Sequence, residues 1–138
     1  MNSNKFLIGG IAGGIANFIL GYLFYGLLLK KFFAENGMMV NMDTIVWWAL
    51  IVGNLVTGLL FSYIIGKANV SSTGGGAGIG FTVGILMALS LDLMMYSFGQ
   101  GMKEFKGIAA DILTTAVISA IVGAVIGYFY GMGKKAAA

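Results

Sequence analysis

The chain has 138 residues, of which 59% are hydrophobic and 9% are charged, and its formal net charge is +3. Soluble domains carry about 25% charged residues, so this composition excludes a soluble fold and a disordered chain. Cys and His are absent and every basic residue is Lys, which excludes thiolate or imidazole metal sites, Ser–His or Cys–His catalysis, and guanidinium clamps on phosphate. We expect a polytopic membrane protein that is not an enzyme and has no cofactor or metal.

Four uncharged stretches are long enough to cross the membrane, since a helix needs about 20 apolar residues to span the hydrocarbon core. In chain order, we expect transmembrane helices near 6–29, 44–66, 76–99 and 107–131. Barrel strands would alternate strictly over about ten residues, and no such alternation is present. The predicted fold is therefore an all-α membrane protein: one domain, 1–138, that forms a four-helix transmembrane bundle with tightly packed, Gly-rich helices.

The first stretch is too long for the apolar core of a signal peptide, which has about 7–15 residues, so we expect a retained first helix. Four spans place both termini on one side. The lysine count, which marks cytoplasmic loops, is equal on the two sides: Lys5, Lys67, Lys134 and Lys135 against Lys30, Lys31, Lys103 and Lys106. We favour a bacterial inner membrane with both termini in the cytoplasm. Lysines divided between the two sides of the membrane can contact anionic lipid headgroups. We do not expect nucleic-acid binding, which needs a concentrated basic patch.

Small residues recur at four-residue spacing on every predicted helix. Residues i and i+4 share a helix face, and small residues there let two helix backbones approach closely in lipid. The glycines that we expect to pack in this way are Gly9, Gly13, Gly21, Gly58, Gly76, Gly80, Gly84, Gly123 and Gly127. These ridges serve either packing within one chain or an oligomer interface.

Asn17 and Asn54 lie near the midpoints of the first two predicted helices. An amide in hydrocarbon needs hydrogen-bond partners, because an unsatisfied polar group there costs several kcal/mol. One interpretation is an interhelical hydrogen bond that fixes the helix register. The other is a pore or a substrate site.

Asp92 is the most informative residue, since an ionised Asp at this depth costs at least about 2.5 kcal/mol on insertion scales. It extends the line of Gly80, Gly84 and Ala88 toward Tyr96. We expect it to face away from lipid and to be hydrogen-bonded or protonated, with Asn17, Asn54 or Tyr96 as partners. Three roles stay open: a structural one, an ion or proton pathway, and contact with another subunit.

Asp111 falls within the first turns of the fourth predicted helix, where a negative charge complements the helix dipole. Asp92 and Asp111 are both displaced toward the side that holds the 30–43 and 100–106 loops. If they converge, they form one acidic vestibule on that side.

Three short motifs carry a resemblance to a known family. They are Gly-Tyr-Leu-Phe-Tyr at 21–25 before a basic, aromatic stretch, Tyr-Ser-Phe-Gly at 96–99 before a short basic loop, and Ile-Ala-Ala-Asp at 108–111. In layout, the chain resembles an uncharacterised family of small four-span bacterial membrane proteins, known only as a domain of unknown function. The resemblance implies the four-span topology and no established activity.

Two functions compete. The packing ridges and the lack of reactive groups favour a non-catalytic protein that works by helix–helix assembly, as a homo-oligomer or as an accessory subunit of a larger membrane complex. The alternative is a small dimeric ion or solute transporter or channel that uses Asp92 with Asn17 and Asn54. An enzyme acting on lipids is poorly supported without His, Cys or Arg. The expected partners are the lipid bilayer and copies of the chain or other membrane subunits.

Overall fold

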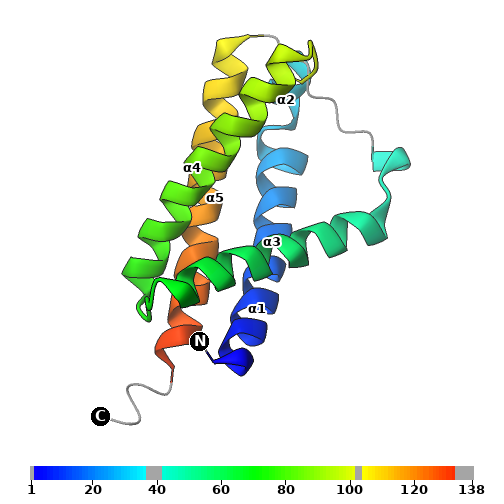
Figure 1. Ribbon diagram of the computed structural model, residues 1–138. Helices are drawn as coiled ribbons and strands as arrows, with labels where there is room; N and C mark the ends of the chain where they lie inside the picture. The colour runs from blue at the N-terminus through cyan, green and yellow to red at the C-terminus, as the bar shows by residue number, and fades with distance from the viewer. Residues whose placement is uncertain (1, 37–41, 102–103, 133–138) are drawn as a thin grey trace.

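The computed structural model describes residues 2–36, 42–101 and 104–132. The described residues form helices, turns and connecting segments without strands, and four helical stretches are long and apolar enough to span a membrane. The expected all-α, four-helix transmembrane bundle is thereby confirmed, and the chain is an integral membrane protein (Figure 1). Lys103, Lys134 and Lys135, which enter the orientation count, lie outside the described residues.

The first span is built from two kinds of helix. The α-helix α1, Ser3–Gly21, begins three residues before the predicted start because the Asn2 side chain accepts a hydrogen bond from the Asn4 amide at 2.9 Å. The π-helix η1, Tyr22–Leu28, continues it without a break. Its wider turn is closed by the Leu29 amide, which donates to the Phe24 carbonyl at 2.8 Å. The short helix α2, Lys30–Glu35, follows.

The second and third spans are joined by a tight connection. A 3₁₀ turn, η2, Met42–Thr44, precedes α3, Trp47–Lys67, so this helix begins three residues later than the predicted 44. The helix α4, Thr73–Ser97, begins three residues earlier than the predicted 76. Its glycine-rich start is helical because the Ser72 hydroxyl accepts a hydrogen bond from the Gly75 amide at 3.1 Å.

The fourth span, α5, Phe105–Gly131, is the central helix of the bundle. It packs along the whole of α4 and also contacts α1 and α3. Side chains from α3 and α5 form the main core, which consists of Phe61, Ile65, Ile118, Val122, Ile126 and Tyr130. In Figure 1, α4 and α5 run side by side, while α3 crosses the view at a steep angle to both.

The contact between α4 and α5 is made by facing small residues. A Cβ added at Gly76 would overlap the Gly123 carbonyl oxygen, and one at Gly80 would overlap that of Ser119. A Cβ at Gly84 would meet the Ser119 side chain at 2.5 Å. The two backbones therefore touch, as the small-residue ridge predicts for Gly76, Gly80 and Gly84.

A second row of backbone contacts joins α1 to α3. A Cβ at Gly58 would overlap the Gly10 carbonyl oxygen, and one at Gly14 would lie 2.8 Å from the Leu55 Cα. Gly9 and Gly13 instead face α5, where a Cβ at Gly13 would lie 2.7 Å from Ile126 Cδ1. The first helix thus wedges between α3 and α5.

Other ridge glycines have different surroundings. Gly123 and Gly127 face the start of α4, and a Cβ at Gly127 would overlap the Ser72 carbonyl oxygen. Gly21 was expected to pack against a helix, and that expectation is wrong. A Cβ at Gly21 would meet nothing within 4 Å, because no helix packs against α1 at this position.

The beginning of α1 and the end of α5 lie at the same end of the bundle. The Lys5 ammonium group donates a hydrogen bond of 2.9 Å to the Tyr130 carbonyl oxygen. This contact satisfies a carbonyl that the helix leaves unbonded at its C-terminus. The first and last spans therefore leave the membrane on one side.

Candidate functional site

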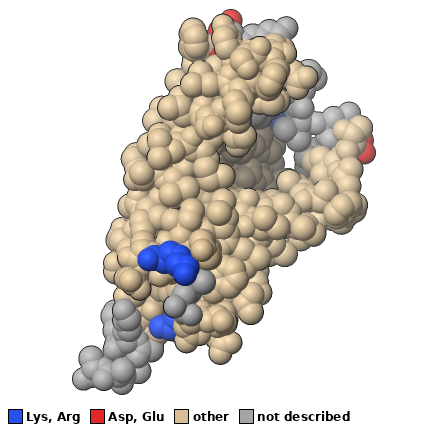
Figure 2. Space-filling view, in the orientation of Figure 1, with Lys and Arg blue, Asp and Glu red and all other residues tan. Residues whose placement is uncertain are grey.

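A cavity of about 460 Å³ lies where α3 diverges from the other helices. Its walls come from α1, η1, α3, α4 and α5. Figure 2 shows a hollow between the body of the bundle and the projecting α3. The cavity is mostly apolar and aromatic, with a few polar side chains: Asn17, Asn54, Thr57, Thr115, Ser119 and the Tyr25 hydroxyl.

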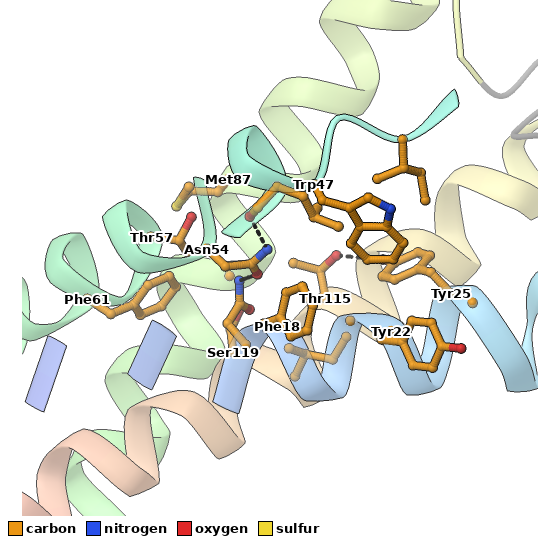
Figure 3. Close-up of a pocket in the computed structure, with 17 residues that line it drawn as sticks. Phe18, Tyr22, Tyr25, Trp47, Asn54, Thr57, Phe61, Met87, Thr115 and Ser119 are labelled. Carbon is orange, nitrogen blue, oxygen red and sulfur yellow. Dashed lines mark hydrogen bonds between the residues drawn. The ribbon is translucent and has the colours of Figure 1, made fainter. Parts of the chain in front are cut away.

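Figure 3 shows how these side chains are distributed along the cavity. Tyr25 and Trp47 lie close together at one end, Phe61 lies at the other, and Asn54 lies between them. An apolar pocket with a few convergent polar groups is the usual form of a small-molecule site. Its volume is within the range of about 300–1,000 Å³ typical of such sites.

Asn17 and Asn54 bond to each other across the cavity wall. The Asn17 amide nitrogen donates to Asn54 Oδ1 at 2.7 Å, and the Asn54 amide nitrogen donates to the Leu50 carbonyl oxygen at 2.8 Å. This chain of bonds joins α1 to α3 near the middle of both spans. Neither amide is paired with Asp92, so the structure does not support that expected partnership.

A second polar group sits behind the cavity wall, where η1 meets α5. The Tyr25 hydroxyl donates to Asp111 Oδ1 at 2.5 Å and lies 3.0 Å from the Thr115 hydroxyl. Asp111 is only 8% exposed, whereas Tyr25 and Thr115 both line the cavity. Tyr25 therefore connects a buried carboxyl group to the cavity.

Asp92 lies against Asp111 across the contact between α4 and α5. The buried line Gly76, Gly80, Gly84, Ala88 continues to Asp92 on the same face of α4. In an antiparallel helix pair, residues equally far from the connecting turn lie opposite each other. Gly80 and Gly123 are such a pair, and the same register places Asp92 opposite Asp111.

The two carboxyl groups are close enough for one to donate a hydrogen bond to the other when it carries a proton. As two carboxylates they would have no donor between them, and Asp92 Oδ2 is buried without a hydrogen-bond partner among the described residues. Two adjacent charges in hydrocarbon would also be very costly. A proton shared between the two would supply the missing donor and remove one charge.

Asp92 and Asp111 thus lie together, as expected for an acidic vestibule. The expectation that Tyr96 is a hydrogen-bond partner of Asp92 is wrong. Tyr96 is 45% exposed, and its ring packs against Phe105 with centroids 5.5 Å apart. Tyr25 takes its place beside the acidic pair. Sequence reasoning missed Tyr25, and the signal that was available is its position in the aromatic motif at 21–25.

The described residues contain no group of three or more His, Cys, Asp or Glu that could hold a metal ion. The cluster formed by Asp92, Asp111, Tyr25 and Thr115 can hold a proton within the membrane and exchange it through hydroxyl groups.

No protein-family model, curated protein or solved structure matches this chain.

Proposed function

We propose that the protein is a small membrane carrier, which binds an amphipathic solute in the cavity and couples its movement to a proton on the Asp92–Asp111 pair. The observation that carries the proposal is the cavity itself, about 460 Å³ in volume and bordered by the Asn17–Asn54 pair. Elsewhere the α1–α3 and α4–α5 pairs pack backbone against backbone. An open space among such helices is therefore a feature of the fold and not loose packing.

The position of the polar groups supports this proposal. Ligand sites combine apolar walls with a few polar groups that fix the orientation of the ligand. Here two amides and several hydroxyls from different helices face one space. Tyr25 joins that space to the acidic pair, so a solute in the cavity and a proton on the pair are within reach of each other.

A cavity-filling substitution tests the proposal. Gly21 lines the cavity and has open space where its Cβ would be, so Gly21→Phe should place a ring in the cavity without a backbone clash. Gly78 on α4 has equally open space but does not line the cavity. Gly78→Phe is therefore the matched control.

The assay measures charge movement by reconstituted protein on a solid-supported membrane under a pH gradient. The probes are an amine, a quaternary ammonium ion, a carboxylic acid and an alcohol with the same alkyl chain. We expect at least one probe to give a current that Gly21→Phe abolishes and Gly78→Phe retains. If no probe gives a current above that of empty liposomes, the carrier function is wrong.

A second candidate function, assembly, is favoured by the first half of α3. This half extends from the bundle (Figure 1), and its large apolar side chains are exposed, with Trp48 at 72% and Val56 at 58%. We propose that it packs against a second copy of the chain or against another membrane subunit, which would also enlarge the pathway available to a carrier.

Cysteine cross-linking in the native membrane tests the assembly, and the chain has no Cys of its own to interfere. Val52→Cys on the extended half of α3 should form a cross-linked dimer or a cross-link to another protein. Leu86→Cys, exposed on α4, should cross-link much less. Equal cross-linking at the two sites would point to random collisions and against an interface at α3.

We also propose that the membrane is a bacterial inner membrane and that the end of the bundle with Lys5 faces the cytoplasm. The support is the layout that the chain shares with small bacterial four-span proteins. Asn2→Cys should then resist a membrane-impermeant maleimide in intact cells and react after the cells are lysed. Labelling in intact cells would reverse the orientation.

A further inference from the structure

We infer that the cavity selects a cationic amphiphile, an apolar body that carries a primary or secondary ammonium group. This inference rests on the proposed carrier function and names its substrate class. It follows from the hydrogen-bonding state of each polar group on the cavity wall.

The amide pair leaves an acceptor toward the cavity. Because the Asn54 amide nitrogen is bonded to the Leu50 carbonyl oxygen, its Oδ1 must face Asn17. The Asn17 group that meets it must then be the amide nitrogen, which fixes the orientation of the Asn17 side chain. Asn17 Oδ1 receives no hydrogen bond from the described residues, so the pair offers an oxygen acceptor to a ligand.

The hydroxyl groups add further acceptors. Thr57 uses its proton on the Gly53 carbonyl oxygen at 3.0 Å, which leaves only lone pairs on its oxygen. Tyr25 donates to Asp111, so the proton between Tyr25 and Thr115 comes from Thr115. The Thr115 oxygen therefore also has lone pairs to offer.

Ser119 is an unpaired polar group on the cavity wall. Its side chain is 5% exposed, lines the cavity and lies in the space that the missing side chain of Gly84 leaves. No described residue forms a hydrogen bond with its hydroxyl. This hydroxyl is therefore able to accept a hydrogen bond from a ligand in the cavity.

A ligand that matches these groups must bring hydrogen-bond donors. An ammonium group brings up to three donors and no acceptor. The ionisable groups nearest the cavity, Asp111 and Asp92 behind Tyr25, are both acids, and no Lys lines the cavity among the described residues. The faces of Tyr22 and Trp47 also attract a cation. A carboxylate in the same space would meet acceptors and like charges.

Trp47 provides a direct probe of the cavity. The chain has two Trp residues, of which Trp47 lines the cavity and Trp48 is 72% exposed. The variant Trp48→Phe retains only Trp47, which is itself 44% exposed, and Trp47→Phe retains only Trp48. Bromine quenches Trp fluorescence on contact, so brominated amphiphiles report cavity occupation together with partition into lipid in the first variant and partition alone in the second.

The experiment compares ω-bromoundecylamine, ω-bromoundecanol and ω-bromoundecanoate in lipid nanodiscs. After subtraction of the signal from Trp47→Phe, we expect saturable quenching of Trp47 by the amine. Its half-saturation concentration should be at least about tenfold lower than that of the alcohol, a difference of about 1.4 kcal/mol. The acid should give no saturable quenching.

The variant Tyr25→Phe, in the Trp48→Phe background, should weaken amine binding about tenfold and leave alcohol binding little changed. Tyr128→Phe, an exposed tyrosine, is the matched control. If the alcohol or the acid binds better than the amine, the substrate class is wrong and binding in the cavity stands. If no probe quenches Trp47 saturably, the cavity does not bind amphiphiles and the carrier proposal fails with it.

Discussion

Two glycines on α4, Gly80 and Gly78, should respond in opposite directions to the same substitution. A Cβ at Gly80 would overlap the Ser119 carbonyl oxygen of α5, which is a backbone atom and can move only if a helix moves. A Cβ at Gly78 would meet nothing within 4 Å. Gly80→Ala therefore forces two packed helices apart, whereas Gly78→Ala adds a methyl group to open space.

The expected magnitudes follow from these surroundings. Replacing Gly with Ala inside a helix stabilises it by up to about 1 kcal/mol through helix propensity, and this contribution is common to both positions. Overpacking a tight contact costs about 1–3 kcal/mol and applies to Gly80 alone. The free energies of unfolding of Gly78→Ala and Gly80→Ala should therefore differ by about 1–3 kcal/mol, with Gly78→Ala the more stable protein.

Reversible unfolding in mixed detergent micelles with increasing dodecyl sulfate measures this difference, with helix content followed by circular dichroism. Comparison of the two variants cancels the propensity contribution, so the remaining difference reports the contact between α4 and α5. If the two variants agree within about 0.5 kcal/mol, the scatter of ordinary surface substitutions, then the backbones of these helices do not meet at Gly80.

Two further predictions concern the hydrogen bonds between spans. A double-mutant cycle of Asn17→Ala and Asn54→Ala should give a coupling energy of about 0.6–2 kcal/mol in the same unfolding assay, and additive effects would show that the bond is absent. Lys5→Met should lower the free energy of unfolding by about 0.3–1 kcal/mol, because it removes a cation from the C-terminus of α5. Lys30→Met, on an exposed side chain at the start of α2, should have a smaller effect than Lys5→Met.

The spans were predictable because the hydrocarbon core imposes their length on the sequence. The stretches between charges locate all four helices, and their ends lie within three residues of the observed ones, with some of the differences set by a local hydrogen bond. Ser72, for example, extends α4 backward through its hydrogen bond to Gly75. Such caps depend on one side chain and the backbone conformation beside it, so a hydropathy pattern does not show them.

The spacing of small residues predicts which face of a helix packs against another helix. It does not predict over what length the two helices stay in contact. Gly9, Gly13 and Gly21 belong to one row, yet only the first two are packed. Gly9 and Gly13 face α5, whereas Gly21 lines the cavity, so no partner helix follows this row as far as Gly21. The length over which two helices stay in contact depends on their crossing angle, which a single-helix pattern does not contain.

The acidic pair was within reach of the sequence. If α4 and α5 form an antiparallel pair about a turn near Gly101, residues equally far from that turn face each other. This register matches Gly80 with Gly123, as the structure has it, and it matches Asp92 with Asp111. Taken alone, Asp92 left three roles open and Asp111 had a structural explanation, and the acidic vestibule was expected only if the two converge. The register supplies that condition, because it places the two acids opposite each other.

Tyr25 was beyond such reasoning because it lies in the π-helix. Positions along an α-helix follow the i, i+4 rule, but η1 is wound with i+5 bonds, so faces assigned upstream of Gly21 cannot be carried through it. The wider turn aims the Tyr25 hydroxyl at Asp111 while its ring stays on the cavity wall. Short π-helical segments are often found at functional sites. Tyr25, which links the cavity to the acidic pair in the described part of the chain, is therefore a residue that the regular helical pattern misplaces. Departures from local rules of this kind are common at functional sites.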